Sequence, residues 1–317
     1  MTSPGAEVAA ALARFEGALD PARPTASGDV EVLGFGEISV ALRLAALPGL
    51  VCKRMSGFAG DSDVARYVDL VEEYLHLLAL AGVRVADTAP QVVRREGRAP
   101  VVYLVQPELP VDSLGHQILR TADDAGVVQA IEGVLAAVIR LAEANRDARG
   151  VAVALDGQLS NWSQPASGDG FEEPVLIDVG TPFIRRDGRH AIDLALLHRP
   201  IPPGIRAYYR WRGEVGAYLD DYFDPRLVAV DLLGNFHKEG RPDRIPLGVA
   251  TVNGWLAVQV GVLGERPVVT TAEVERYYRK DAGLLALYLR LRKGDRFVRT
   301  RVLRRPYDYV LPEHVAR

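Results

Sequence analysis

The segment Ala154-Leu155-Asp156-Gly157-Gln158-Leu159-Ser160-Asn161 carries the pattern on which the interpretation of this sequence depends. It follows a long amphipathic stretch over residues 123–146, which predicts a polar loop after a helix. Asp156 and Asn161 would place a carboxylate and an amide oxygen in one tight loop. The carboxylate could take a proton from a hydroxyl group, and the amide oxygen could bind Mg²⁺. Taken alone, the segment could also be an ordinary turn.

A second acidic position follows in the stretch Val175-Leu176-Ile177-Asp178-Val179-Gly180. The apolar run predicts a short strand that ends at Asp178, with a glycine two positions later. A carboxylate at the end of a buried strand is well placed to bind a metal ion. An aspartate that only ends a strand is the alternative.

Upstream, residues 28–56 are predicted to form strands joined by turns, with glycines between two of them. Gly34 and Gly36 would let the backbone approach a polyphosphate closely. A dinucleotide-binding fingerprint is excluded because no helix follows at once, and a P-loop is excluded because Gly-Lys-Ser/Thr is absent. An ordinary glycine-containing hairpin remains the alternative.

Lys53 lies on the next predicted strand, between apolar residues, in a chain that uses few lysines. A lysine that faces inward needs a counter-charge or a phosphate, because unpaired burial is costly. Glu72 or Glu73, on a helix predicted over residues 61–81, could supply the counter-charge. A lysine on the solvent face of a half-buried strand is the alternative.

These elements occur in a meaningful order: glycine-rich turn, strand lysine, helix glutamate, Asp-x-x-x-x-Asn, then Asp-x-Gly. The order resembles the protein-kinase signature and, more closely, that of the kinase-like phosphotransferases, which include aminoglycoside and choline kinases. The resemblance spans about residues 28–182 and suggests a bacterial branch of that superfamily. Beyond Phe183 the sequence offers only helical patterns, as in the variable substrate-binding part of such enzymes.

The resemblance implies an α+β fold with two lobes and ATP bound between them. The expected division is an N-terminal helical extension over residues 1–27, a small β-rich N-lobe over residues 28–106 and a larger, mainly helical C-lobe over residues 107–317. Within the N-lobe, further strands are predicted over residues 90–95 and 100–106.

The resemblance also implies a role for each motif residue. Asp156 would be the catalytic base, and Asn161 and Asp178 would hold Mg²⁺. Lys53 would hold the α- and β-phosphates and pair with Glu73, which suits the family spacing better than Glu72. The residues expected to bind the nucleotide, including a hinge against the adenine, are Gly34, Gly36, Ser39, Lys53, Glu73, Gln106, Glu108 and Leu109.

Three positions depart from the family pattern. The usual histidine two residues before the catalytic aspartate is Ala154, which puts the order of the loop and the rate in doubt. The third glycine of the glycine-rich turn is Ser39, and the aromatic residue after the metal-binding aspartate is Val179. None of these changes removes a reacting or metal-binding group.

The composition is that of a folded protein, with 48% apolar residues, 25% charged residues and a net charge of −3. A single cysteine, Cys52, excludes an internal disulfide. The first residues lack the features of a signal peptide. Residues 245–264 are uncharged but contain Asn253 and Gln259, so a buried core segment is expected there rather than a membrane span. We therefore expect a cytoplasmic protein without a membrane partner.

Charge is unevenly distributed in the C-terminal half. Residues 276–305 contain eleven Arg and Lys residues against two Asp. Such a block could meet an anionic substrate or nucleic acid, but pairing with an acidic face of the same protein is the expected outcome. Asp220, Asp221, Asp224 and Asp231 form an acidic cluster, expected to be a solvated helix end; in aminoglycoside kinases such groups attract a cationic substrate.

The function expected from these features is Mg²⁺- and ATP-dependent transfer of a phosphoryl group to a hydroxyl of a small molecule. Phosphorylation of Ser or Thr in a peptide or protein is less favoured, because no Ala-Pro-Glu-type segment follows Gly180. A nucleotide-binding pseudokinase without turnover is the alternative of a different class. Ala154 supports it, whereas the intact Lys53, Asp156 and Asp178 oppose it.

Overall fold

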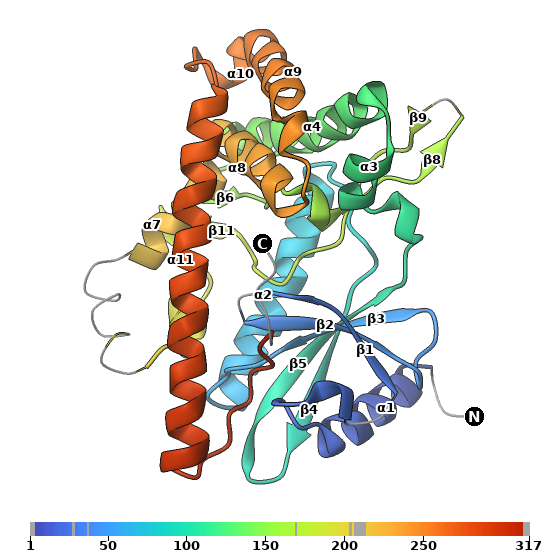
Figure 1. Cartoon of the computed structure of the whole chain (residues 1–317), viewed down its shortest axis with the longest axis vertical. Coiled ribbons are helices and arrows are strands. Elements are labelled where there is room, and N and C mark those ends of the chain that lie inside the picture. Colours follow the sequence, from blue (N-terminus) through green and yellow to red (C-terminus); the bar gives the residue numbers. More distant parts are fainter. Residues whose placement is uncertain are drawn as a thin grey trace.

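The computed structural model describes residues 4–26, 29–36, 38–168, 170–202, 205 and 214–312. A five-stranded antiparallel sheet occupies one end of the molecule, and a mainly helical part occupies the other (Figure 1). The expected α+β architecture with two lobes is therefore confirmed. The predicted lobe boundary at residue 106 falls near the end of the last strand of the sheet.

The large sheet contains β1 (Val30–Phe35), β2 (Ser39–Leu44), β3 (Leu50–Met55), β4 (Ala89–Arg95) and β5 (Arg98–Pro107). Shorter strands are β6 (Val151–Val153), β7 (Trp162–Ser163), β8 (Ala166–Ser167), β9 (Gly170–Phe171), β10 (Val175–Leu176), β11 (Ile184–Arg186) and β12 (Arg189–His190). The helices include α1 (Pro4–Ala18), α2 (Asp61–Leu80), α3 (Gly115–Thr121), α4 (Asp124–Asp147), α5 (Leu194–His198), α7 (Glu214–Asp220), α8 (Pro225–Lys238), α9 (Ile245–Val258), α10 (Val260–Leu263) and α11 (Thr271–Phe297). A π-helical turn (Val298–Val302) follows α11.

The sheet has the order β1-β2-β3-β5-β4, so β3 lies at its centre. Both faces of the central strands are covered, which explains why the run from Val101 to Val105 on β5 is buried without interruption. On one face α1 contributes Leu12 to a cluster with Val40 and Tyr103. On the other face α2 joins the main core of the protein, which includes Leu104. The strands and helices predicted for this part of the chain are confirmed.

α4 runs through the helical part and packs against α8 and α9. Its apolar face, with Val127, Ile131 and Val134, is fully buried. Among the described helices it is the one that is long and apolar enough to cross a membrane by length and composition, and half of that apolar window is buried. A buried core helix has the same composition. The uncharged segment over residues 245–264 is instead divided into α9 and α10.

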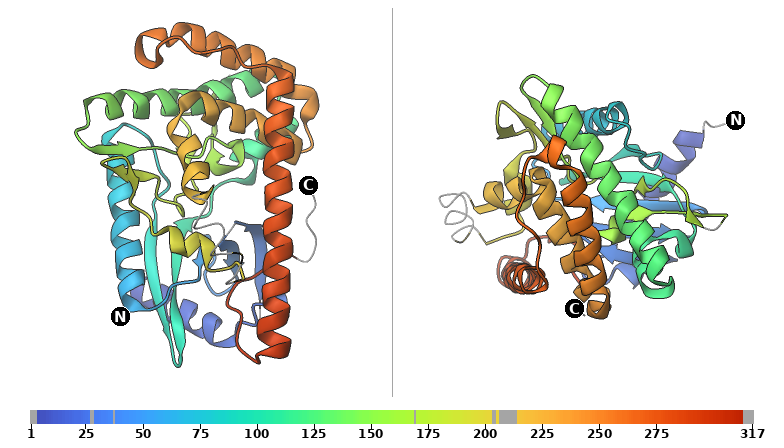
Figure 2. Two further views of the ribbon diagram at one scale, coloured as in Figure 1. Left: turned by 90° about the vertical axis from the view of Figure 1, so that its left-hand side faces the viewer. Right: turned by 90° about the horizontal axis from the view of Figure 1, so that it is seen from above.

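α11 extends along one side of the molecule from the helical part to the sheet (Figure 2). The chain then reverses, and the segment from Tyr307 to Leu311 returns toward the sheet. Val310 joins the apolar cluster formed by α1 and the sheet. The end of the described chain thus belongs to the N-lobe, which the division at residue 106 did not anticipate.

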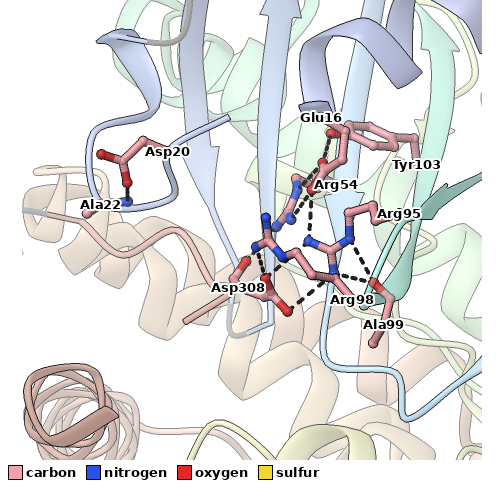
Figure 3. A network of polar contacts seen from close by, with 9 residues as sticks. All are labelled: Glu16, Asp20, Ala22, Arg54, Arg95, Arg98, Ala99, Tyr103 and Asp308. Carbon is pink, nitrogen blue, oxygen red and sulfur yellow. Dashed lines mark hydrogen bonds and ion pairs between the residues drawn. The ribbon is translucent and has the colours of Figure 1, made fainter. Parts of the chain in front are cut away.

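A buried polar network fixes this returning segment to the sheet (Figure 3). Arg54 on β3 is only 1% exposed. Its Nε and Nη2 donate to the two carboxylate oxygens of Glu16 on α1, at 2.8 and 2.7 Å, and its Nη1 donates to the Asp308 carbonyl at 2.7 Å. The Tyr103 hydroxyl also donates to Glu16, and Arg95 contacts both Glu16 and the Asp308 carboxylate. Each of these charged side chains therefore has a partner of opposite charge.

The network controls the ionisation of its acids. Burial on its own would raise the pKa of the Glu16 carboxyl, but Arg54, Tyr103 and Arg95 together hold that pKa below its ordinary value. The pKa of Asp308 is lowered in the same way, because Arg95 and Arg98 outweigh its burial. Both acids therefore stabilise the fold above their unfolded pKa values, and this contribution is lost as the pH falls through the folded ones.

Removal of Arg54 should strongly destabilise the protein. Arg54→Ala leaves the Glu16 carboxylate buried without its main partner, and we expect a loss of about 3–5 kcal/mol in the free energy of unfolding. Arg94→Ala is the matched control, because Arg94 and its partner Asp61 are both exposed and such pairs contribute about 0–1 kcal/mol. Urea unfolding measures both losses. Equal losses would contradict the role assigned to the network.

Candidate active site

An ion pair between the two lobes lies at the centre of the site. Lys53 projects from β3, and its Nζ lies 2.5 Å from Oδ1 of Asp178, just after β10. The same Oδ1 accepts a hydrogen bond from the Gly180 backbone N–H at 3.0 Å. A Cβ at position 180 would come within 3.2 Å of Cε and Nζ of Lys53, which explains the glycine. The structure therefore brings together the predicted phosphate-binding lysine and the predicted metal-binding aspartate.

Local charge keeps Asp178 ionised. Burial alone would raise the pKa of its carboxyl, but the Lys53 ammonium and the Gly180 N–H hold the pKa below its ordinary value. Among the described residues its second oxygen has no partner, and an ionised carboxylate of this kind is a ligand that Mg²⁺ prefers.

The loop containing Asp156 is held beside Asp178 by strand pairing. β7 pairs with β10, with Trp162 opposite Leu176, and the Ile177 N–H donates to the Asn161 carbonyl at 2.9 Å. Asn161 therefore lies next to the segment that carries Asp178. The Asn161 side chain is also close enough to the Asp156 carboxyl to lower its pKa. The three residues predicted from Asp-x-x-x-x-Asn and Asp-x-Gly are thus adjacent in the structure.

Asp156 has the opposite electrostatic environment to Asp178. One of its oxygens accepts the Gln158 N–H at 2.9 Å. Burial, helped by the negative charge of Asp178, raises the pKa of Asp156 to about 6, although the Gln158 N–H and Lys238 act in the other direction. A carboxylate with this pKa is ionised at neutral pH and is a stronger base than an ordinary aspartate.

The glycine-rich turn joins β1 and β2. The Gly36 N–H donates to the Ser39 carbonyl at 3.0 Å, which makes the turn tight. A Cβ on Gly36 would lie 2.4 Å from Ser39 Oγ, whereas a Cβ on Gly34 would meet nothing within 4 Å. A side chain at position 36 would therefore displace the Ser39 hydroxyl, whereas one at position 34 would enter open space beside the strand.

The predicted hinge follows β5, and most of its polar groups are already used within the protein. The Gln106 amide donates to the Ile177 carbonyl at 2.9 Å and to Thr88 at 2.8 Å. The Glu108 N–H donates to the Gly49 carbonyl, and the Glu108 carboxylate pairs with an arginine of β2. Among the described residues, the Leu109 N–H has no acceptor. Leu109 is therefore the hinge residue with a free backbone donor.

The structure does not form the expected pair between Lys53 and Glu73. Glu73 lies on the part of α2 that faces β11, and its carboxylate pairs with Arg186. Glu72 is exposed. The helix periodicity was predicted correctly, but the acid chosen on it was wrong, because Asp178 is the acid that neutralises Lys53.

Two tyrosines of α2 hold the site instead. The Tyr67 hydroxyl donates to the Gly180 carbonyl at 2.8 Å, and the Tyr74 hydroxyl, two turns later, donates to the Ala154 carbonyl at 2.8 Å. Both side chains are buried. Both tyrosines lie within the helix predicted over residues 61–81, but sequence reasoning assigned them no polar role. A buried tyrosine hydroxyl usually requires a hydrogen-bond partner, and that requirement was the available signal.

A polar recess adjoins the Asp156 loop. The Gln158 amide donates to Oδ2 of Asp231 on α8 at 3.0 Å, and burial raises the pKa of Asp231 well above its ordinary value. Asp231 is buried and therefore differs from two other members of the acidic cluster. Asp224 caps α8, and Asp220 pairs with Arg185. The recess is lined by Gln158, Asp231, Asn235, Lys238, Tyr277, Tyr278 and Asp281.

The donor set suits a metal ion that arrives with a nucleotide. No group of three or more His, Cys, Asp or Glu side chains able to hold a metal occurs within the described part of the chain. Asp178 and Asn161 would supply two oxygen ligands. Mg²⁺ is commonly bound in this way, by one or two protein ligands together with phosphate oxygens and water. The residues present therefore fit the expected magnesium–nucleotide group.

The hydrogen bond from Tyr74 should stabilise the loop that carries Asp156. Tyr74→Phe leaves the Ala154 carbonyl without its donor, so we expect a loss of about 1–3 kcal/mol in the free energy of unfolding. Tyr278→Phe is the matched control, because its hydroxyl has no partner among the described residues and should cost little. Chemical unfolding of both variants tests this, and equal effects would contradict it.

Three solved structures are among those similar to this chain. WaaP in complex with acyl carrier protein is 16% identical over 83% of this chain and 88% of that chain, with a TM-score of 0.34. A Stt7 homolog from Micromonas algae soaked with ATP is 16% identical over 77% and 79%, with a TM-score of 0.38. The GDP and kanamycin complex of APH(2'')-IIIa is 14% identical over 73% and 94%, with a TM-score of 0.32.

These TM-scores lie below 0.5, and the function proposed below is therefore argued from the Lys53–Asp178 pair and the adjacent Asp156 loop. No curated protein matches the sequence. A family model matches residues 16–296, which is most of the chain, and the protein therefore belongs to the family of unknown function DUF6206.

Proposed function

We propose that this protein is a phosphotransferase that uses Mg²⁺ and ATP to phosphorylate a hydroxyl group of a small molecule. The observation that carries the proposal is the Lys53–Asp178 pair beside Asp156 and Asn161. A strand lysine, two oxygen ligands and a separate carboxylate base are the parts that phosphoryl transfer needs, because catalysis consists mainly of positioning and charge stabilisation.

Each residue has a distinct task in this proposal. The Lys53 ammonium binds the phosphates, and the turn around Gly36 covers them. Asp178 and Asn161 hold Mg²⁺, which neutralises phosphate charge when bound. The Leu109 N–H is the donor available to the adenine. Asp156 accepts the proton from the acceptor hydroxyl.

The two carboxylates are suited to different tasks. The pKa of Asp178 is lowered by Lys53, so it stays ionised as a ligand, whereas the pKa of Asp156 is raised by burial, so it can bind a proton. Neighbouring acids whose pKa values are pushed apart commonly divide the roles of base and charged partner in this way.

The polar side chains around the recess favour a small polar acceptor near Asp156 over a protein chain. It lies beside Asp156 and is lined by carboxylate, amide and phenol groups from α8 and α11. Lys238 at the end of α8 acts electrostatically on both Asp156 and Asp178. Its ammonium therefore adds positive charge where the transferred phosphoryl group would pass.

Ala154 gives less support to a pseudokinase than the sequence suggested. The histidine usual at this position supports the catalytic loop in related enzymes. Here both backbone groups of Ala154 are hydrogen-bonded. Its N–H donates to the Phe183 carbonyl at 2.9 Å, and its carbonyl accepts from the Tyr74 hydroxyl. The loop thus has other supports, which favours an active enzyme.

Mg²⁺ and ATP together should stabilise the protein, by about 2.7 kcal/mol at a concentration 100 times the dissociation constant. Asp178→Ala should abolish the Mg²⁺-dependent part of this gain, because it removes a metal ligand. Asp112→Ala, at an exposed position of the same residue type, is the control and should retain the gain. Thermal unfolding with ATP, with and without Mg²⁺, is the measurement. Absence of any nucleotide-induced shift in the wild type would exclude the proposal.

Asp156→Asn should separate binding from turnover. The substitution keeps the shape of the side chain and removes the base, so ATP affinity should persist while transfer falls by about 10²- to 10⁴-fold. Wild-type activity should fall as the pH drops below about 6, because the Asp156 carboxylate becomes protonated there. Turnover in an acceptor screen, followed by ATP consumption against pH, measures both effects. Equal turnover of the two proteins would refute the role of Asp156, and equal inactivity with intact binding would favour a pseudokinase.

A further inference from the structure

The end of α11 presents apolar side chains to solvent as a group. Phe297 is 62% exposed and Val298 is 45% exposed, and in the following π-helical turn and bend Val302 and Leu303 are 65% and 52% exposed. Single exposed apolar residues are ordinary on protein surfaces, whereas neighbouring ones mark contact sites. These four lie within seven consecutive residues and are therefore a candidate contact surface.

Cations surround this apolar group. Arg301, Arg304 and Arg305 are exposed, and among the described residues none of them has an acidic partner. Arg299 is different, because it pairs with Asp295 at 2.8 Å. The sequence led us to expect that the basic block pairs with an acidic face of the same protein, and in the described structure this is not so for the three exposed arginines.

The backbone places this surface at an end of the molecule. The chain reverses after the π-helical turn, with Arg304 in the left-handed region at φ 51°. Figures 1 and 2 show the reversal at the end of α11 away from α9 and α10, where the chain turns back along the sheet. The seven residues Phe297, Val298, Arg301, Val302, Leu303, Arg304 and Arg305 are called the basic tip below.

We propose that the basic tip binds the anionic surface of a lipid bilayer. Such a surface satisfies both components, because anionic headgroups attract arginine and the boundary of the acyl chains accepts small apolar side chains. This proposal replaces the expectation, based on the absence of a membrane span, that the protein has no membrane partner.

The two other occupants of such a surface fit less well. A nucleic acid would neutralise the arginines, but its phosphate backbone offers no apolar counterpart to Val298, Val302 and Leu303. A second copy of the chain would cover the apolar residues, but it would bring two sets of unpaired arginines together, and like charges at an interface are unfavourable.

The basic tip and the polar recess are on opposite parts of α11. Tyr277 lines the recess, and Phe297 begins the tip. At 1.5 Å per helical residue they lie roughly 30 Å apart along the helix. Attachment at the tip therefore leaves the recess open, and the proposal does not depend on the proposed phosphotransferase activity.

Sedimentation of the full chain with lipid vesicles tests the proposal. We expect binding to vesicles rich in phosphatidylglycerol, little binding to pure phosphatidylcholine, and a loss of binding at high salt, because the attraction is partly electrostatic. Combined substitution Phe297→Ser and Val302→Ser should weaken binding by about tenfold or more. A second variant reverses the charge at all three arginines (Arg301→Glu, Arg304→Glu and Arg305→Glu). It should weaken vesicle binding at least as much.

The matched control is Val258→Ser with Val268→Ser, since these valines are 78% and 69% exposed and lie outside the tip. The control should bind vesicles like the wild type. All substituted residues are exposed, and thermal unfolding of each variant checks that it folds. The two sets of tip substitutions are independent, so failure of one to fold leaves the other as a test.

Several results would overturn the proposal. These are equal binding to neutral and anionic vesicles, no vesicle binding, or wild-type binding by both tip variants. Tighter binding to RNA or DNA than to anionic vesicles would identify the tip as a nucleic-acid site instead. Dimerisation that the tip substitutions abolish, measured by sedimentation equilibrium, would assign it to a second copy. The Mg²⁺- and ATP-dependent stabilisation should be unchanged in the tip variants, so neither proposal stands or falls with the other.

Discussion

Two neighbouring cations on the central strand β3, Lys53 and Arg54, impose much of the architecture. Successive side chains of a strand point to opposite faces, so the two charges enter different parts of the protein. Each is costly to bury unless it is paired. Lys53 meets Asp178 from the C-lobe, and Arg54 meets Glu16 from α1 together with the Asp308 carbonyl. One strand therefore connects the catalytic loops, the N-terminal helix and the returning end of the chain.

The motifs of the site could be recognised in the sequence because the residues of each motif are close together along the chain. Asp156 and Asn161 share one loop, and Asp178 ends an apolar strand whose pairing partner immediately follows Asn161. Hydrophobic periodicity of 3.6 or 2 residues likewise defines α2, α4 and the strands of the sheet. These features depend on neighbours along the chain, which the sequence displays directly.

The partners of the buried charges could not be predicted in the same way. Glu73 was a reasonable ion-pair partner for Lys53 by its position along α2. On the helix surface, however, its side chain lies toward Arg186, with which it pairs. Tyr67 and Tyr74 lie on a helix that the sequence predicts, but the carbonyl groups they bind belong to distant loops. Arg54 and Asp308 are separated by 254 positions in the sequence, and no local sequence pattern predicts their contact.

The pairing of Arg54 with the Asp308 carbonyl has a consequence for the synthesis of the protein. β3 is made early, but its guanidinium lacks part of its hydrogen bonding until a residue 254 positions later has been added. At translation rates of about 5–20 residues per second, this interval lasts roughly ten seconds to a minute. During that time the nascent N-lobe holds an incompletely satisfied arginine next to its hydrophobic face. The final packing of the sheet is thus delayed until the segment around Asp308 has been made.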